Sequence, residues 1–129
     1  MTVKTGSNQV VVDSSGWVEY FGEGPKTASF EPYLQREGDL LLPTIVLYEV
    51  LKKLLATRGE MAANRFLSAA LRHTVVAFDE HLALAAVDVS LKYRLAMADA
   101  IIYATASLHG AELITSDQAF QGLPGVTLF

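Results

Sequence analysis

Four acidic residues stand at positions where a folded chain could bring their side chains together. Asp13 ends a run of three valines, and Glu49 lies inside an apolar stretch with helical spacing. Asp99 opens a long apolar segment, and Asp117 comes two residues after a short run that ends in Ile-Thr. Grouped carboxylates repel one another unless a cation lies among them, and hard divalent cations take oxygen ligands. The four acids are therefore a candidate metal site.

The ions that suit these ligands are Mg²⁺ and Mn²⁺. The chain has no cysteine and three histidines, whereas zinc sites are built from thiolate and imidazole groups. Mg²⁺ keeps several water ligands, so it can turn one toward a phosphate and stabilise the charge that develops there. Ser15 and Thr115 stand close to two of the acids, where a hydroxyl can hold a carboxylate or an ion-bound water in place. The histidines have no ligand spacing and are predicted to be surface residues: His73, His81 and His109.

Each acid also has a purely structural explanation. Asp13, Asp99 and Asp117 precede predicted helices, and an aspartate that caps a helix N-terminus stabilises it by about 0.5–2 kcal/mol. Glu49 lies four residues before Lys53, and such a pair on a helix surface contributes about 0.2–0.5 kcal/mol. A ligand that faces a cleft also points away from the core, so helical periodicity leaves both explanations of Glu49 open.

The segments that carry the acids alternate between predicted strands and predicted helices. Strands are expected at 9–13, 40–42, 73–78, 112–115 and 126–129, and helices through 14–21 and at 27–37, 44–57, 60–72, 79–93 and 98–109, with a helical turn at 117–120. This alternation indicates an α/β fold of three layers, in which a central parallel sheet has helices on both faces. Sites in such sheets form beyond the carboxyl ends of the strands, where the strand order reverses. Three of the four acids lie at a strand end or a helix start.

Two helices have patterns that predict what they bury. The helix at 44–57 is amphipathic, and its expected buried stripe consists of Leu47, Val50, Leu51, Leu54 and Leu55. The helix at 98–109 is apolar almost all round and stops at Gly110, which indicates a buried helix. Two large aromatic residues, Trp17 and Tyr103, are interpreted as packing residues.

Composition sets the class of protein. The 129 residues are 51% hydrophobic and 19% charged, which is typical of a globular chain and excludes disorder; we expect residues 1–129 to form a single domain. No signal peptide is visible and no apolar run reaches the roughly 18 residues needed to span a bilayer, so we expect a cytoplasmic protein. The absence of cysteine excludes a disulfide scaffold. The mean hydropathy of +0.30 suggests that another chain covers part of the helix surface.

The net charge of −4 argues against nonspecific binding of nucleic acid, which needs clustered cations. The basic residues nevertheless stand close to the acids in the sequence. Three of them follow Glu49 and two precede Asp99: Lys52, Lys53, Arg58, Lys92 and Arg94. If both groups flank the cleft, they form a basic, RNA-binding rim around an acidic site; the alternative is that they are solvated residues on helix faces.

Four segments follow one another in an order that matches a known family. They are VVVDSSGW at 10–17, PTIVLYEVLKKL at 43–54, YRLAMADAIIYATA at 93–106 and LITSDQAFQGLPGV at 113–126. The third is the most specific, because Asp-Ala opens an apolar, alanine-rich helix. The chain resembles the PIN-domain family, and within it the VapC-type toxins of bacterial and archaeal toxin–antitoxin pairs. The resemblance is collinear over nearly the whole chain, although 22–27 and 60–72 match no motif.

The resemblance implies a PIN-like fold and an endoribonuclease that depends on Mg²⁺ or Mn²⁺. Its catalytic and metal-binding residues would be Asp13, Glu49, Asp99 and Asp117, and hydrolysis of the RNA phosphodiester bond would use water activated by the ion. The resemblance also implies a homodimer and a cognate antitoxin protein, as in a type II toxin–antitoxin system.

Two other functions remain open at this point. One is another α/β phosphotransfer protein, such as a haloacid-dehalogenase-like phosphatase or a receiver domain. The phosphatase requires a second acid two residues after its nucleophile, where this chain has Ser15, and the receiver domain requires paired acids early in the chain, where none precede Asp13. The other is a noncatalytic PIN-like binding module, although the chain retains all four acids.

Overall fold

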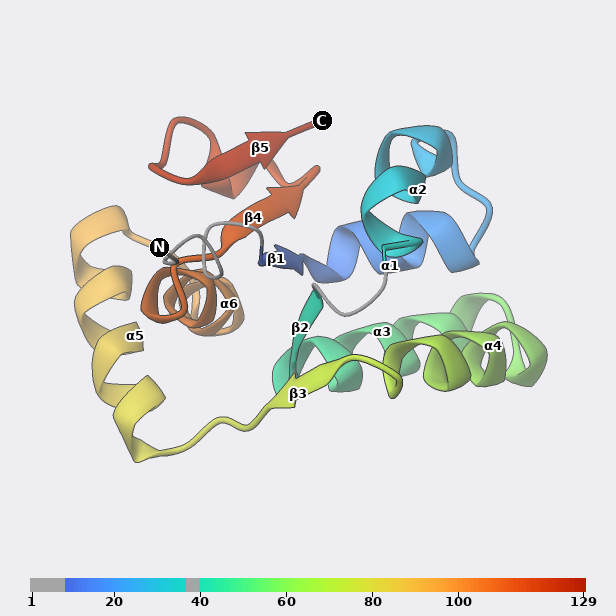
Figure 1. The fold of residues 1–129 in the computed structure, drawn as a ribbon, viewed down its shortest axis with the longest axis horizontal. Coiled ribbons are helices and arrows are strands. Elements are labelled where there is room, and N and C mark those ends of the chain that lie inside the picture. The colour runs from blue at the N-terminus through green and yellow to red at the C-terminus, as the bar shows by residue number, and fades with distance from the viewer. Residues whose placement is uncertain (1–8, 37–39) are drawn as a thin grey trace, which may run out of the picture.

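The computed structural model describes residues 9–36 and 40–129, and its centre is a sheet of five parallel strands (Figure 1). The strands are β1 (Val10–Val12), β2 (Leu40–Pro43), β3 (Thr74–Val76), β4 (Glu112–Thr115) and β5 (Val126–Leu128), in the spatial order β3-β2-β1-β4-β5. The three inner strands consist mainly of valine, leucine and isoleucine, as expected for strands that are covered on both faces. The predicted parallel α/β sheet is confirmed.

Six helices surround the sheet. They are α1 (Ser14–Phe21), α2 (Thr27–Leu34), α3 (Thr44–Thr57), α4 (Glu60–Ala70), α5 (Glu80–Tyr93) and α6 (Met97–Leu108), followed by a 3₁₀ turn, η2 (Gln118–Phe120). Figure 1 shows α5 and α6 on one side of the sheet and α1, α2 and α4 on the other. Helix α2 ends three residues before the predicted end at 37, a position that lies outside the described residues. Within the described ranges, no helix is long and apolar enough to cross a bilayer.

The strand order reverses between β1 and β4. From β1 the chain moves outward to β2 and β3, then returns to place β4 on the opposite side of β1. The register pairs Val12 with Ile114, so the residues that follow, Asp13 and Thr115, lie side by side at the carboxyl ends of β1 and β4. Ligands bind at such reversal points because adjacent connections diverge there and leave a crevice.

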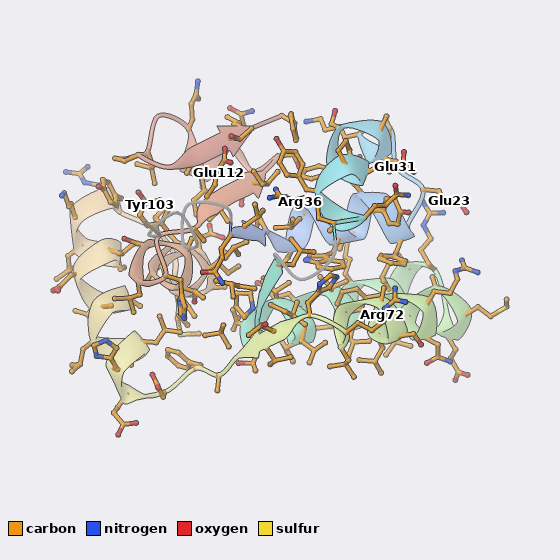
Figure 2. The ribbon with its side chains drawn as sticks, in the orientation of Figure 1. Glu23, Glu31, Arg36, Arg72, Tyr103 and Glu112 are labelled. Carbon is orange, nitrogen blue, oxygen red and sulfur yellow. The ribbon has the colours of Figure 1, made fainter. Side chains whose placement is uncertain are left out.

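Helix α6 forms much of the core on its side of the sheet. All residues from Ala100 to Ala106 are buried, which confirms the predicted buried helix. Tyr103 (Figure 2) packs between Tyr93 and Phe120, and its hydroxyl donates a hydrogen bond of 2.6 Å to the carbonyl of Pro124. Tyr103 is therefore a packing residue, as predicted.

The buried stripe of α3 differs from the prediction. The predicted members Val50 and Leu54 are buried, but the third buried residue is Val46, which was not predicted, and Leu55 is 52% exposed. The predicted members Leu47 and Leu51 lie half-buried at the edge of the stripe. Val46 and Leu47 both continue the helical spacing of Val50 and Leu54, and Val46 is the one buried because α3 packs against α1, α4 and β2. The correction turns Glu49 from the far side of the helix to the border of the core, next to α1.

Helix α1 lies directly against the core because residue 16 is glycine. A Cβ atom added to Gly16 would come within 2.5–2.7 Å of Val12 and Phe30, which is closer than real side-chain contacts. The close packing of α1 against Val12 and Phe30 places Ser14 and Ser15, at the start of α1, at the carboxyl end of β1.

Candidate functional site

All four predicted acids line one cavity of about 530 Å³. It lies where β1 and β4 end and where α1, α3 and α6 approach them. Its lining consists of Asp13, Ser14, Ser15, Val18, Tyr48, Glu49, Lys52, Lys53, Ala56, Asp99 and Asp117. The fold thus brings together carboxylates that are up to 104 positions apart in the sequence, from Asp13 to Asp117.

Asp13 is the most deeply buried of the four acids, with 3% of its surface exposed. Its Oδ2 atom accepts hydrogen bonds from the Thr115 hydroxyl at 2.8 Å and the Ser15 hydroxyl at 3.0 Å. Burial raises the pKa of Asp13, because desolvation disfavours the charged form, and these two bonds partly offset the rise. Asp13 stands at the N-cap position of α1 but makes no side-chain capping bond. The capping explanation is therefore wrong for this residue.

Two hydroxyls join the end of β4 to the start of α1. Thr115 is fully buried, and its Oγ1 atom also accepts a hydrogen bond of 2.9 Å from the backbone N–H of Asp117. The Ser15 hydroxyl accepts one of 3.1 Å from the backbone N–H of Ser116. These bonds fix the direction of the Asp13 carboxylate and the path of the chain toward Asp117.

Asp117 is the acid for which the capping explanation holds. Its Oδ1 atom accepts a hydrogen bond of 2.9 Å from the backbone N–H of Ala119 and so caps the short turn η2. That bond uses one of the two carboxylate oxygens. The Asp117 side chain can therefore cap η2 and still present its other carboxylate oxygen to the cavity.

Asp99 is the third residue of α6, whose N-cap is Ala96, so it is not a cap. Its side chain is half-buried and receives no hydrogen bond from the described residues. Desolvation, followed by the negative charges of Asp117, Asp13 and Glu49 in that order of effect, raises the pKa of Asp99 to about 6. The other three carboxylates therefore act electrostatically on Asp99.

Glu49 is held by α1 rather than by its own helix. Its Oε1 atom accepts a hydrogen bond of 2.6 Å from the Ser14 hydroxyl, and this contact replaces the surface pair with Lys53 considered above. Sequence reasoning missed Ser14 and Tyr48 as site residues. The available signals were that Ser14 follows Asp13 directly and that Tyr48 precedes Glu49 on the same helix.

The basic residues divide into two groups. Lys52 and Lys53 line the acidic cavity. Arg58 lines a separate hollow near the end of α3, and Lys92 and Arg94 are exposed residues that do not line the acidic cavity. The structure therefore places two of the five predicted rim residues at the acids.

The ligand atoms of the cavity suit a hard divalent cation. They are carboxylate oxygens with hydroxyls beside them, which match Mg²⁺ or Mn²⁺. Within residues 9–36 and 40–129, no three or more histidine, aspartate or glutamate side chains are arranged to hold a metal ion. Like charges repel, so the side chains would have to draw together around a cation. Asp99 fits the role of a metal ligand for two reasons. Its carboxylate receives no hydrogen bond from the described residues, and burial and the other carboxylates disfavour its negative charge.

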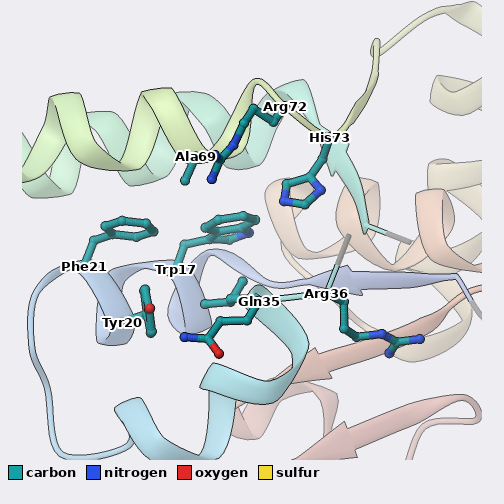
Figure 3. A pocket seen from close by; sticks show the side chains of 9 residues that line it. Trp17, Tyr20, Phe21, Gln35, Arg36, Ala69, Arg72 and His73 are labelled. Carbon is teal, nitrogen blue, oxygen red and sulfur yellow. The ribbon is translucent and has the colours of Figure 1, made fainter. Parts of the chain in front are cut away.

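A second cavity, of about 540 Å³, lies on another face of α1 (Figure 3). Its lining consists of Trp17, Tyr20, Phe21, Leu34, Gln35, Arg36, Ala69, Arg72 and His73. The prediction that His73 is a surface residue is wrong: it is half-buried, its Nδ1 atom has no hydrogen-bond partner among the described residues, and desolvation lowers its pKa. His81 and His109 are exposed, as predicted. Trp17 is a core residue whose Nε1 donates to the carbonyl of Val12.

Comparisons with known proteins agree with this architecture. The family model of the PIN domain matches residues 10–126. No curated protein matches the chain. Among solved structures, a toxin–antitoxin complex from Klebsiella pneumoniae is similar, with a TM-score of 0.77 and 25% identity over 92% of this chain and 96% of the other.

Two further solved structures share the fold at lower identity. VapC20 of Mycobacterium tuberculosis, a toxin that cleaves the sarcin–ricin loop, has a TM-score of 0.76 and 16% identity, over 92% of this chain and 97% of the other. VapBC2 of Rickettsia felis, bound to a fragment of promoter DNA, has a TM-score of 0.69 and 16% identity, over 93% of this chain and 96% of the other.

Proposed function

The chain belongs to the PIN-domain family, and from this we propose that it is a metal-dependent endoribonuclease and the toxin of a type II toxin–antitoxin pair. The observation that carries the proposal is the single cavity that all four carboxylates line, where desolvation and the charges of the other three raise the pKa of Asp99. The family assignment excludes the haloacid-dehalogenase-like phosphatase and the receiver domain. A noncatalytic PIN-like module is the remaining alternative, and the tests below separate it from the nuclease.

Each side chain has a part in the proposed reaction. Asp13, Asp99, Asp117 and Glu49 would hold the cation. When bound, Mg²⁺ or Mn²⁺ supplies positive charge at the scissile phosphate and lowers the pKa of water. Ser15 and Thr115 keep Asp13 in one orientation, as hydrogen-bonding partners of metal ligands generally do.

Lys52 and Lys53 would contact RNA phosphates, because they are the cations that line the acidic cavity. They supply positive charge at the site of a chain whose net charge is −4. We do not extend this role to Arg58, Lys92 or Arg94, which lie elsewhere.

The proposal predicts that a divalent ion stabilises the folded chain. Mn²⁺ at 100 times its dissociation constant should add about 2.7 kcal/mol to the free energy of unfolding. The double variant Asp13→Ala with Asp99→Ala should lose most of this gain, because it lacks two of the four ligands. Thermal melts with chelator and with Mn²⁺ measure the gain, and calorimetry measures the heat of binding.

The matched control is Asp88→Asn, which removes an exposed acid from α5 outside the cavity. It should respond to Mn²⁺ as the wild type does. The same samples are then assayed for cleavage of mixed RNA with Mg²⁺, Mn²⁺ or chelator. Equal stabilisation of all three proteins would contradict the metal site, and a wild type that binds the ion without cutting RNA would favour the noncatalytic module.

We also propose two protein partners: a second copy of the chain and an antitoxin. The support is the similarity to a toxin–antitoxin complex and the exposure of large apolar side chains on α5 and at the start of α6, including Leu84, Leu91 and Met97. The bound antitoxin segment should place an Arg or Lys near Asp99, since a cation there would replace the charge of the ion.

The partner proposal predicts a dimer in solution. Light scattering at micromolar concentration should give twice the chain mass, and the double variant Leu84→Glu with Leu91→Glu should give one chain mass and still unfold cooperatively, because charges in an apolar interface are unfavourable. A wild type that is monomeric would contradict the dimer. A co-purified antitoxin without a cation near Asp99 would contradict the proposed mode of inhibition.

A further inference from the structure

Tyr48 differs from every other tyrosine in the chain. Tyr20, Tyr33 and Tyr93 pack against the core, and Tyr103 is buried in it. Tyr48 is 59% exposed and does not pack on the core. Burial of an aromatic side chain is a large source of stability, so packing does not explain an aromatic residue at this position.

The place of Tyr48 is the wall of the acidic cavity. It precedes Glu49 on α3, so its ring and the carboxylate belong to adjacent residues of one helix. Val18 and Ala56 add apolar surface to the same cavity. The cavity thus combines an acidic part with an aromatic and apolar part.

One cation lies against the ring and a second lines the same cavity. The Lys52 ammonium lies 5.6 Å from the centroid of the Tyr48 ring and 3.5 Å from its hydroxyl oxygen. Lys52 is four residues after Tyr48, so the helix holds the two side chains on one face. Lys53 also lines the cavity. An exposed ring in a cavity with lysines is the combination that binds single-stranded nucleic acid, in which bases stack on aromatic rings and cations neutralise phosphates.

We propose that Tyr48 positions the substrate: its ring stacks on a nucleobase next to the scissile phosphate, while Lys52 and Lys53 contact the adjoining phosphates. The inference rests on the proposed nuclease function and adds a residue that recognises the base. The base must be unpaired to lie on the ring, because both faces of a base inside a duplex are covered by its neighbours. Stacking tolerates any base, so we expect Tyr48 to select RNA by whether a base is unpaired and exposed more than by which base it is.

The test measures stacking without cleavage. Short single-stranded RNA oligonucleotides carry the fluorescent base 2-aminopurine at each position in turn, and binding is followed in chelator. Wild type should quench the fluorescence at one or two positions. Tyr48→Ala should abolish the quenching and weaken binding about tenfold or more, whereas Tyr48→Phe, which keeps the ring, should behave as wild type.

The matched control is Leu55→Ala, which shortens another exposed side chain of α3 that does not line the cavity. It should bind and quench as wild type does. With Mg²⁺, Tyr48→Ala should reduce kcat/KM mainly through a higher KM, and its metal-induced rise in melting temperature should equal that of wild type, because no proposed metal ligand is changed.

The outcomes separate the two proposals. Quenching that survives in Tyr48→Ala, or that is lost equally in Leu55→Ala, overturns the role of Tyr48 even if RNA is cut. A wild type that quenches through Tyr48 but cuts no RNA with any divalent ion supports the stacking and overturns the nuclease. A wild type that neither binds nor cuts RNA overturns both.

Discussion

Asp99→Asn should lower RNA cleavage by about 100-fold or more without destabilising the chain in the absence of metal. Asparagine has the shape of aspartate, and Asp99 receives no hydrogen bond from the described residues that the change could break. The variant loses a negative charge that three other carboxylates and partial burial disfavour. It also loses one proposed ligand, so the stabilisation by Mg²⁺ should shrink.

The same substitution changes how stability depends on pH. The folded-state pKa of Asp99, about 6, lies above its ordinary value of 3.8, so between these values the folded chain binds the proton more tightly than the unfolded chain does. The free energy of unfolding of wild type in chelator therefore falls as pH rises through this window. Because Asp99 is half-exposed, solvent screening reduces the effect to roughly 1 kcal/mol. Asp99→Asn should lack the part of this fall that Asp99 contributes.

Thermal melts at pH 4.5 and 7.5, with chelator and with Mg²⁺, measure these differences beside a cleavage assay. The control is Asp79→Asn, because Asp79 is the N-cap of α5 and accepts a bond of 2.9 Å from the backbone N–H of Leu82. Asparagine caps about as well as aspartate, so this variant should match wild type in every measurement. Normal cleavage together with normal metal stabilisation in Asp99→Asn would show that Asp99 is not a ligand.

The sequence predicts the bounds of a helix well where residues at both of its ends, such as proline or glycine, mark where it starts and stops. Helix α3 was expected at 44–57 and spans Thr44–Thr57, because Pro43 ends the preceding strand and Gly59 follows the helix. Its buried face was predicted only in part: Val50 and Leu54 are buried as expected, but Val46 takes the place expected for the leucines at 47, 51 and 55. Only the positions of α1 and α4 decide which set is covered, and the sequence of α3 does not contain that information.

The candidate site shows a similar limit. An aspartate before a helix is equally consistent with a cap and with a ligand, and the distinction for Asp13 depends on Thr115, 102 residues away. The prediction of a basic rim was wrong for three of its five residues because it relied on their closeness to the acids in the sequence. Arg94 is five residues from Asp99, yet it ends α5 in a left-handed conformation and its exposed side chain does not line the cavity. The catalytic roles of the acids remain predictions, which the variants described here test.

Thr115→Val should damage the site through a residue that carries no charge. Valine keeps the approximate shape of threonine but removes the hydroxyl that donates to Asp13 and accepts from the backbone N–H of Asp117. Leaving buried polar groups without a partner costs about 1–3 kcal/mol of stability. The Thr115 bond is the largest influence that lowers the pKa of Asp13, so its loss should raise that pKa further and shift the acid limb of the pH–rate profile to higher pH.

Loss of the same hydroxyl should weaken Mn²⁺ binding and cleavage about 10–100-fold, the usual effect of removing a partner that orients a ligand. Thr115→Ser restores the hydroxyl and should recover most of the activity and the original pH profile. Thr105→Val is the matched control: Thr105 is equally buried, but its hydroxyl donates to the carbonyl of Ile101 within α6, so this variant should alter stability alone. A general packing defect would affect Thr105→Val and Thr115→Val alike and leave both pH profiles in place. A shift of the acid limb confined to Thr115→Val and reversed by serine is therefore evidence that the hydroxyl acts through the Asp13 carboxylate.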